Sequence, residues 1–214
     1  MDFKTIIKDA LILFVITVVA GLGLGFVHMI TEEPIKQVQE QAKQKAYRTV
    51  FEDATEFKNL DESTLPTDLF VNVLADAGIE KDEVSEVVAA MKDSAYAGMV
   101  VTVVAKDGYG GNIKFSVGIQ KDGTVNGISI LSINETAGLG MKAKEAKFQS
   151  AFDHKNVKEF VVTKSGAAKD GDVDAISGAT ITSKAVTKGV NSAIAAFEYL
   201  TANGVKLEGG VSVE

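Results

Sequence analysis

The chain has no cysteine and only two histidines among its 214 residues. The absence of cysteine excludes disulfides, thiolate metal sites, cysteine-ligated iron–sulfur clusters, a thiol nucleophile and a lipid-modified N-terminal cysteine. The two histidines, His28 and His154, are far apart in the sequence and have no partner at the spacing of metal ligands. We therefore predict no metal site.

Positive charge is also in short supply. Lysine and arginine together number 22 against 29 aspartates and glutamates, which gives a net charge of −7. A nucleic-acid-binding protein needs a basic patch or stripe, and the scattered lysines do not form one, so we predict no nucleic-acid partner. The length suits one folded domain with appendages.

Charged residues are absent from the stretch Ala10 to Ile30, and about 20 apolar residues are enough for a helix to cross a bilayer. Lys4 and Lys8 precede this stretch, whereas acidic residues follow it. The positive-inside tendency then predicts a single-pass protein of the inner or plasma membrane, with a cytoplasmic N-terminus and an extracytoplasmic main domain. Residues 1–31 are the predicted cytoplasmic tip and transmembrane helix. A cleaved signal peptide is the competing interpretation, although the run is longer than a usual signal-peptide core.

Residues 32–83 are predicted to form a juxtamembrane helix and a connecting region. Pro34 can begin a new helix, and an apolar residue recurs at helical spacing from Ile35 to Val50. Residues 53–83 mix acidic and short apolar runs without a sustained period, so no element is assigned to them.

Residues 84–214 are predicted to form the folded domain. Residues 84–91 suit either a helix or a strand, and their β-branched residues favour a strand. Three β-rich runs follow, at 96–105, 112–120 and 125–133, and a Lys-Asp-Gly turn separates each from the next. This pattern predicts an antiparallel meander. Alternation along the second run predicts one face towards a core and the other towards polar surroundings.

Two helices are expected to cover this sheet, which makes the fold class α+β. The first follows Gly140 and carries Met141, Phe148 and Phe152 on one side. The second lies near the C-terminus, where Thr182 or Ser183 can supply the N-cap oxygen. Its apolar stripe consists of Val186, Val190, Ile194, Phe197 and Leu200.

A cluster of hydroxyl residues and one glycine stands immediately before the C-terminal helix, in the run from Asp174 to Ser183. Thr180 would lie in a turn beside the helix N-terminus, where backbone N–H groups and the helix dipole favour phosphate. Helix capping alone is the alternative explanation for such a run.

Two glycine-containing loops precede that run. The loop at 106–112 combines three glycines with Tyr109, so backbone could approach a flat ligand that the aromatic ring touches. The loop at 134–140 follows a strand and offers hydrogen bonds from Glu135 and Thr136 and apolar contact from Leu139. Taken singly, each would pass as an ordinary turn.

The run Asp174-Ala175-Ile176-Ser177-Gly178-Ala179-Thr180 resembles the flavinylation motif of membrane-anchored flavoproteins in ion-pumping electron-transport complexes: Asp, two variable residues, Ser or Thr, Gly, Ala, Thr. Members of that family also carry Gly-Tyr-Gly-Gly-Pro and Glu-Thr-Pro-Gly-Leu-Gly, in that order along the chain. Here Asn112 and Ala137 replace the two prolines. In size and order the chain is most similar to the family of the G subunits of the Rnf complexes, which are ion-translocating ferredoxin:NAD oxidoreductases. The C subunits of the sodium-pumping NADH:quinone oxidoreductases form the nearest related family.

The resemblance implies an extracytoplasmic FMN-binding domain in which a flavin transferase joins FMN through a phosphoester to Thr180. It also implies a redox subunit that relays electrons among other membrane subunits, without catalytic residues or independent activity of its own. The implied cofactor-binding residues are Thr180, Ser177, Gly178, Ala179, Thr182, Ser183, Asp174, Glu135, Thr136, Gly138, Leu139, Gly140, Tyr109, Gly110 and Gly111.

Three other functions remain open from the sequence. An FMN subunit of a Na⁺-translocating NADH:quinone oxidoreductase would share all three motifs. A stand-alone extracytoplasmic flavin reductase would share the threonine motif but act without the pump, and a non-redox anchored binding module would carry no flavin.

Overall fold

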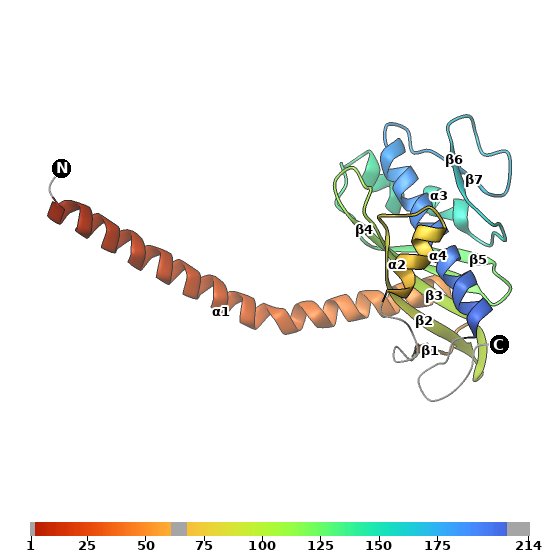
Figure 1. Cartoon of the computed structure of the whole chain (residues 1–214), viewed down its shortest axis with the longest axis horizontal. Coiled ribbons are helices and arrows are strands. Elements are labelled where there is room, and N and C mark those ends of the chain that lie inside the picture. Colours follow the sequence, from red (N-terminus) through yellow and green to blue (C-terminus); the bar gives the residue numbers. More distant parts are fainter. Residues whose placement is uncertain (1–2, 61–67, 205–214) are drawn as a thin grey trace. The chain divides into compact units, whose positions relative to one another are not determined.

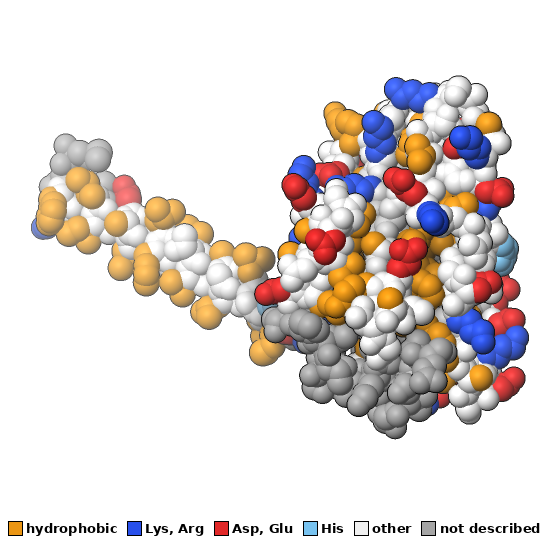
Figure 2. Space-filling view, turned by 45° about the vertical axis from the view of Figure 1, so that its right-hand side comes forward, with side chains coloured by type: hydrophobic (Ala, Val, Ile, Leu, Met, Phe, Trp, Pro, Cys, Tyr) orange, Lys and Arg blue, Asp and Glu red, His pale blue; other side chains and the backbone are white. Residues whose placement is uncertain are grey.

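The computed structural model describes residues 3–60 and 68–204, and the chain divides into two compact units, residues 1–43 and 44–214. Helix α1 (Phe3–Val50) supplies the described part of the first unit and the first residues of the second. Its most apolar segment of 18 residues has a mean hydropathy of 2.7, and none of that segment is buried. By length and composition, this helix can cross a membrane. Figure 2 shows hydrophobic side chains along the visible face of the N-terminal part of this helix.

The expected helix start at Pro34 is wrong, because α1 runs through this proline without ending. Proline lacks the N–H that would bond one turn back, so its place inside a helix removes one hydrogen bond. A salt bridge spans the position: the Lys36 ammonium lies 2.7 Å from the Glu32 carboxylate, one turn before it. The helical period on both sides of Pro34 therefore belongs to one continuous helix.

The second unit is built on a five-stranded antiparallel sheet in which neighbouring strands follow chain order, as the predicted meander requires (Figure 1). Residues 84–91, which suited either a helix or a strand, lie in a strand. The region 53–83, to which no element was assigned, contains a short strand and a short helix. The strands are β1 (Glu56–Asn59), β2 (Glu83–Lys92), β3 (Ala95–Ala105), β4 (Ile113–Gln120) and β5 (Val125–Ser132).

Both faces of this sheet are buried, which corrects the expectation of one polar face. On β4, Phe115 and Val117 face one core, while Ser116 and Gly118 on the opposite face are buried as well. The last turn of α1 covers that second face, and the Val50 carbonyl oxygen occupies the space that a Cβ on Gly118 would need. The polar Ser116 is accommodated by a hydrogen bond with Thr102, 3.0 Å away on β3.

Helix α4 (Thr180–Asn203) and helix α2 (Leu69–Asp76) lie on the first face (Figure 1). The predicted apolar stripe of α4 is confirmed, since all five of its residues are buried. Close approach to the sheet is possible because Gly189 has no side chain: a Cβ there would lie 2.7 Å from the Phe115 ring. Burying such a stripe, rather than helix propensity, supplies most of the stability of a surface helix.

The single helix expected after Gly140 is also wrong, because three short pieces replace it. They are the 3₁₀ turn Gly140–Lys144, the helix α3 (Ala146–Gln149) and the 3₁₀ turn Ser150–Phe152. Glu145 has extended backbone, with φ −75° and ψ 141°, and separates the first piece from the second. Phe148 and Phe152 are nevertheless buried, edge to face with ring centroids 5.7 Å apart.

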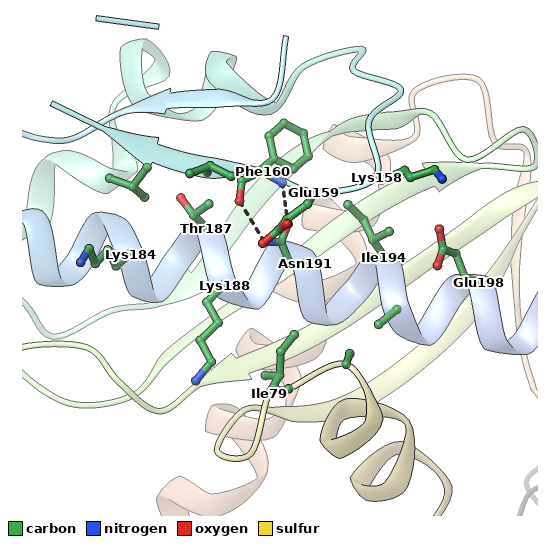
Figure 3. A pocket seen from close by; sticks show the side chains of 15 residues that line it. Ile79, Lys158, Glu159, Phe160, Lys184, Thr187, Lys188, Asn191, Ile194 and Glu198 are labelled. Carbon is green, nitrogen blue, oxygen red and sulfur yellow. Dashed lines mark hydrogen bonds between the residues drawn. The ribbon is translucent and has the colours of Figure 1, made fainter. Parts of the chain in front are cut away.

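A small parallel sheet of β6 (Val161–Thr163) and β7 (Asp172–Asp174) completes the domain and leads directly into the threonine motif. The residue before β6, Phe160, is bound to α4: the Asn191 side chain accepts from its N–H at 2.9 Å and donates to its C=O at 3.0 Å (Figure 3). This contact attaches the segment before the motif to the helix after it.

Candidate functional site

The three motif-bearing loops meet around one cavity of about 550 Å³. It lies where the β3–β4 hairpin, the loop after β5 and the N-terminus of α4 come together. Its lining residues are Tyr109, Glu135, Thr136, Leu139, Gly140, Gly178, Ala179, Thr180, Ile181 and Thr182. All of them except Ile181 belong to the predicted set, so segments more than 70 residues apart in the sequence form a single site.

Thr180 is the first residue of α4 and not part of the turn before it. Gly178, with left-handed backbone at φ 76°, makes the turn, and the Ala179 N–H donates to the Ile176 carbonyl at 2.9 Å. The first backbone N–H groups of a helix have no partner within it and carry its positive dipole end. Thr180 therefore presents its hydroxyl beside a group of donors that suits a phosphate.

The expected side-chain cap is wrong, because Ala179 occupies the N-cap position. Ser183 lies inside the first turn and is buried. Its hydroxyl accepts from the Ile176 N–H at 2.9 Å and donates to the Ala179 carbonyl at 2.9 Å. Ser183 thus holds the motif turn against the helix from within.

The predicted residues Asp174 and Ser177 do not line this cavity. Both are exposed and line a neighbouring cavity of about 700 Å³. The structure therefore divides the motif between a part that faces the cavity and a part that faces away from it.

Glu135 connects the hairpin to the loop after β5. Its carboxylate accepts a hydrogen bond from the Gly110 N–H at 3.2 Å. A Cβ on Gly140 would lie 2.6 Å from the same carboxylate and 2.7 Å from the Thr182 hydroxyl. A Cβ on Gly110 would overlap the Asn134 carbonyl oxygen. These two glycines let three backbone segments approach each other more closely than side chains would allow.

Gly111 and Gly138, which the sequence also placed in the site, do not line the cavity. Both have positive φ, 126° and 75°, and a Cβ on either would meet no atom within 4 Å. Their left-handed backbone shapes the turns that carry the lining residues.

Three large apolar side chains at the cavity are open to solvent: Tyr109 is 72% exposed, Ile181 53% and Leu139 41%. Apolar surface gathered in a concave site favours a ligand with a flat apolar part. Ile181 was missed from the sequence, although one signal was available. It is apolar but stands off the buried stripe of α4, so it has no place in the core.

Charge at the cavity is sparse. Among its lining residues, all of which lie in the described part of the chain, Glu135 carries the single formal charge and neither lysine nor arginine is present. Among these lining residues, only the N-terminus of α4 would therefore attract a negatively charged ligand.

A larger cavity of about 750 Å³ runs over the outward face of α4, between residues 77–79 and 158–162 (Figure 3). Lys184, Lys188 and Asn191 line it. It contains none of the predicted cofactor-binding residues, so we place the candidate site at the smaller cavity.

The residues of the smaller cavity fit FMN. Its volume lies in the usual range of roughly 300–1,000 Å³ for ligand pockets. The exposed apolar side chains suit an isoalloxazine ring, and the helix N-terminus, beside which the Thr180 hydroxyl lies, suits the phosphate.

Comparison with known proteins gives two family matches. Residues 108–195 match the FMN-binding domain, and residues 1–50 match the RnfG N-terminal region. The chain is 34% identical to the G subunit of the Na⁺-translocating ferredoxin:NAD⁺ oxidoreductase complex of Acetobacterium woodii, over 94% of this chain and 96% of that protein. It is 33% identical to the G subunit of the proton-translocating ferredoxin:NAD⁺ oxidoreductase complex of Clostridium ljungdahlii, over 82% and 83%.

Among solved structures, the chain is similar to the C subunit of the Na⁺-translocating NADH-quinone reductase of Parabacteroides distasonis. The TM-score is 0.51 at 24% identity, and the match covers 77% of this chain and 95% of that one. At this identity the likeness establishes the fold alone.

Proposed function

Because the chain belongs to the family of the G subunits of the ion-translocating oxidoreductase complexes, we propose that it is a membrane-anchored flavoprotein that relays electrons within such a complex. The match of residues 108–195 to the FMN-binding domain supports the cofactor, and the apolar part of α1 supports the anchor. Its partners are then the other membrane subunits of the complex. The match of residues 1–50 to the RnfG N-terminal region favours this function over a stand-alone flavin reductase or a component of a quinone reductase.

FMN is attached, in this proposal, through a phosphoester to Thr180, and a flavin transferase makes the bond. The observation that carries the proposal is the position of Thr180 at the first turn of α4, in a cavity with exposed apolar walls. With no basic side chain among the lining residues, the helix N-terminus alone would hold a free phosphate weakly. A covalent bond removes that weakness and keeps the cofactor from diffusing away.

When bound, FMN supplies one- and two-electron transfer chemistry, which suits a relay between different kinds of carrier. The chain's own residues hold and orient it. Tyr109, Leu139 and Ile181 provide apolar contact and exclude water, and Glu135 fixes the hairpin through the Gly110 N–H.

The domain lies outside the cytoplasm in this proposal, because Lys4 and Lys8 precede the apolar segment and Glu32 and Glu33 follow it. Ion translocation belongs to the assembled complex. Residues 10–30 contain no Asp, Glu, Lys or Arg that could carry an ion across the membrane.

The test is expression of the full chain together with a flavin transferase, followed by ultraviolet fluorescence of the denatured protein band. We expect a fluorescent band for the wild type and none for Thr180→Val. Thr187→Val is the matched control, because this threonine lies on the same helix but lines the other cavity, and its band should fluoresce.

Intact mass then identifies the bond. The wild type should gain one FMN less one water. A dark wild-type band, a fluorescent Thr180→Val band or a different adduct mass would each contradict the proposal.

A further inference from the structure

The hairpin that carries Tyr109 is fastened to α4 at its base by an aspartate that does not line the cavity. The Asp107 carboxylate accepts from the Lys188 ammonium of α4 at 2.9 Å and from the Lys81 ammonium at 2.9 Å. Lys188 extends from α4 on the side away from Asn191 and Phe160 (Figure 3). The two lysines hold the pKa of Asp107 below its usual value, with the Lys188 bond as the larger cause.

A second carboxylate ties the preceding residue to the same helix. Asp82 is buried and accepts from the Lys106 N–H at 3.3 Å and from the Ser192 hydroxyl at 3.0 Å. Ser192 and Lys188 are one turn apart on α4. Asp107 is thus bound to α4 directly, and Lys106 is joined through Asp82 to the next turn of the same helix.

The far end of the hairpin is held separately, through the Gly110 N–H and Glu135. Tyr109 lies between these two attachments and is 72% exposed, so its own packing fixes it little. Its position relative to Thr180 is therefore set by the contacts on either side of it.

We propose that Asp107 is a positioning residue of the cofactor site: by joining the hairpin to α4 through Lys188, it fixes the Tyr109 wall of the cavity relative to Thr180. The inference rests on the proposed function, because the object that it positions is the flavin attached at Thr180. Asp107 acts through Tyr109 and is not expected to touch the cofactor.

The chain offers a matched control in the next hairpin. Asp122 occupies the same place in Lys121-Asp122-Gly123 as Asp107 does in Lys106-Asp107-Gly108. Its carboxylate accepts from the Thr124 N–H at 2.9 Å, within its own turn. Asp122→Asn therefore makes the same chemical change without loosening the cavity.

The experiment uses the flavinylated full chain in detergent and measures quenching of flavin fluorescence by iodide, together with the midpoint potential. Asp107→Asn should raise the quenching constant about threefold, because it removes both partly exposed ion pairs of Asp107, with Lys188 and with Lys81. Asp122→Asn should match the wild type. An unchanged quenching constant in Asp107→Asn would overturn the proposal.

Lys188→Met separates positioning from the direct effect of charge. Asp107→Asn removes a negative charge and Lys188→Met removes a positive one, so a pure charge effect would shift the midpoint potential in opposite directions. Positioning predicts the same direction in both, and an Asp107→Asn/Lys188→Met double variant no more altered than either single variant. Opposite shifts would overturn the proposal.

A further measurement distinguishes failure of this inference from failure of the proposed function. Intact mass reports whether each variant carries FMN. If the wild type does not, the proposed function fails, and amide exchange in the unmodified chain still tests the hairpin. There Asp107→Asn should speed exchange at residues 108–111 about threefold relative to Asp122→Asn, and equal exchange would refute the attachment.

Discussion

The two Lys-Asp-Gly turns of the sheet begin with the same three residues and have different roles. The turn at 121–123 is short, and Asp122 bonds to Thr124 within it. The turn at 106–108 continues through Tyr109 to Asn112, and Asp107 bonds to Lys188 of α4 and to Lys81 in the loop before β2. Local sequence is enough to reverse the chain in both cases. The first turn differs because it contacts helix α4 through Asp107 and the loop after β5 through Gly110.

The largest expected difference between the turns concerns their glycines. In Gly110→Ala the new methyl would overlap the Asn134 carbonyl oxygen, which belongs to backbone and cannot move aside cheaply. We expect a loss of unfolding free energy of about 2–3 kcal/mol and loss of flavin attachment. In Gly123→Ala the methyl meets nothing within 4 Å, and only the left-handed backbone at φ 86° opposes it. That cost is about 1 kcal/mol, with attachment retained.

Urea unfolding and flavin fluorescence of the denatured band measure these two effects. Equal destabilisation by both substitutions, or full attachment in Gly110→Ala, would show that the first turn is no more constrained than the second.

A smaller difference concerns pH. Burial raises the pKa of Asp82, the carboxylate beneath the first turn, above its ordinary value. Between that ordinary value and the raised one, the folded state holds a proton that the unfolded state has released, so its contribution to stability falls as pH rises through this window. The Thr124 backbone bond lowers the pKa of Asp122. Asp122 therefore contributes stability above its ordinary pKa, and this contribution is lost as pH falls through the lowered value.

The two aspartates are thus expected to respond to pH with opposite sign. In urea unfolding from about pH 3 to about pH 7, the unfolding free energy of the wild type relative to Asp82→Asn should fall as pH rises, whereas relative to Asp122→Asn it should rise. The same slope in both variants would contradict the assignment.

The smallest effect on stability is expected at Tyr109, the aromatic residue that the second turn lacks. Tyr109→Ala should change the unfolding free energy by less than about 0.5 kcal/mol, because the side chain is 72% exposed. The flavin of this variant should nevertheless be more open to iodide, whereas Thr124→Ala in the second turn should leave quenching unchanged. A large loss of stability in Tyr109→Ala would mean that the ring serves the fold and not the site.

Features that depend on neighbours in the sequence were predictable. Strands β3, β4 and β5, both turns and the stripe of α4 followed from periodicity and turn residues, whereas β1, β6 and β7 were not predicted. Features that depend on distant segments were not. The buried second face of β4 requires the end of α1, and the break at Glu145 interrupts a helix that periodicity alone would continue. The prediction at Pro34 was wrong because proline, which favours the first turn of a helix, here lies inside a long helix.

The site shows the same limit. The three loops were found from their motifs, but Asp174 and Ser177 lie outside the cavity that the other motif residues line. Asp107 could not have been distinguished from Asp122 by sequence, because both follow lysine and precede glycine. Only the fold brings Lys188 to one of them and not to the other.

The burial of Tyr47 and Val50 at the end of α1 has a practical consequence for where the chain can be divided. The Tyr47 ring packs against Phe57 on β1, with centroids 5.4 Å apart, so the last turns of this helix serve as part of the sheet's own core. A fragment that begins at Gln44 keeps these turns. A fragment that begins at β1 would expose an apolar face of the sheet to water and to other copies of the fragment.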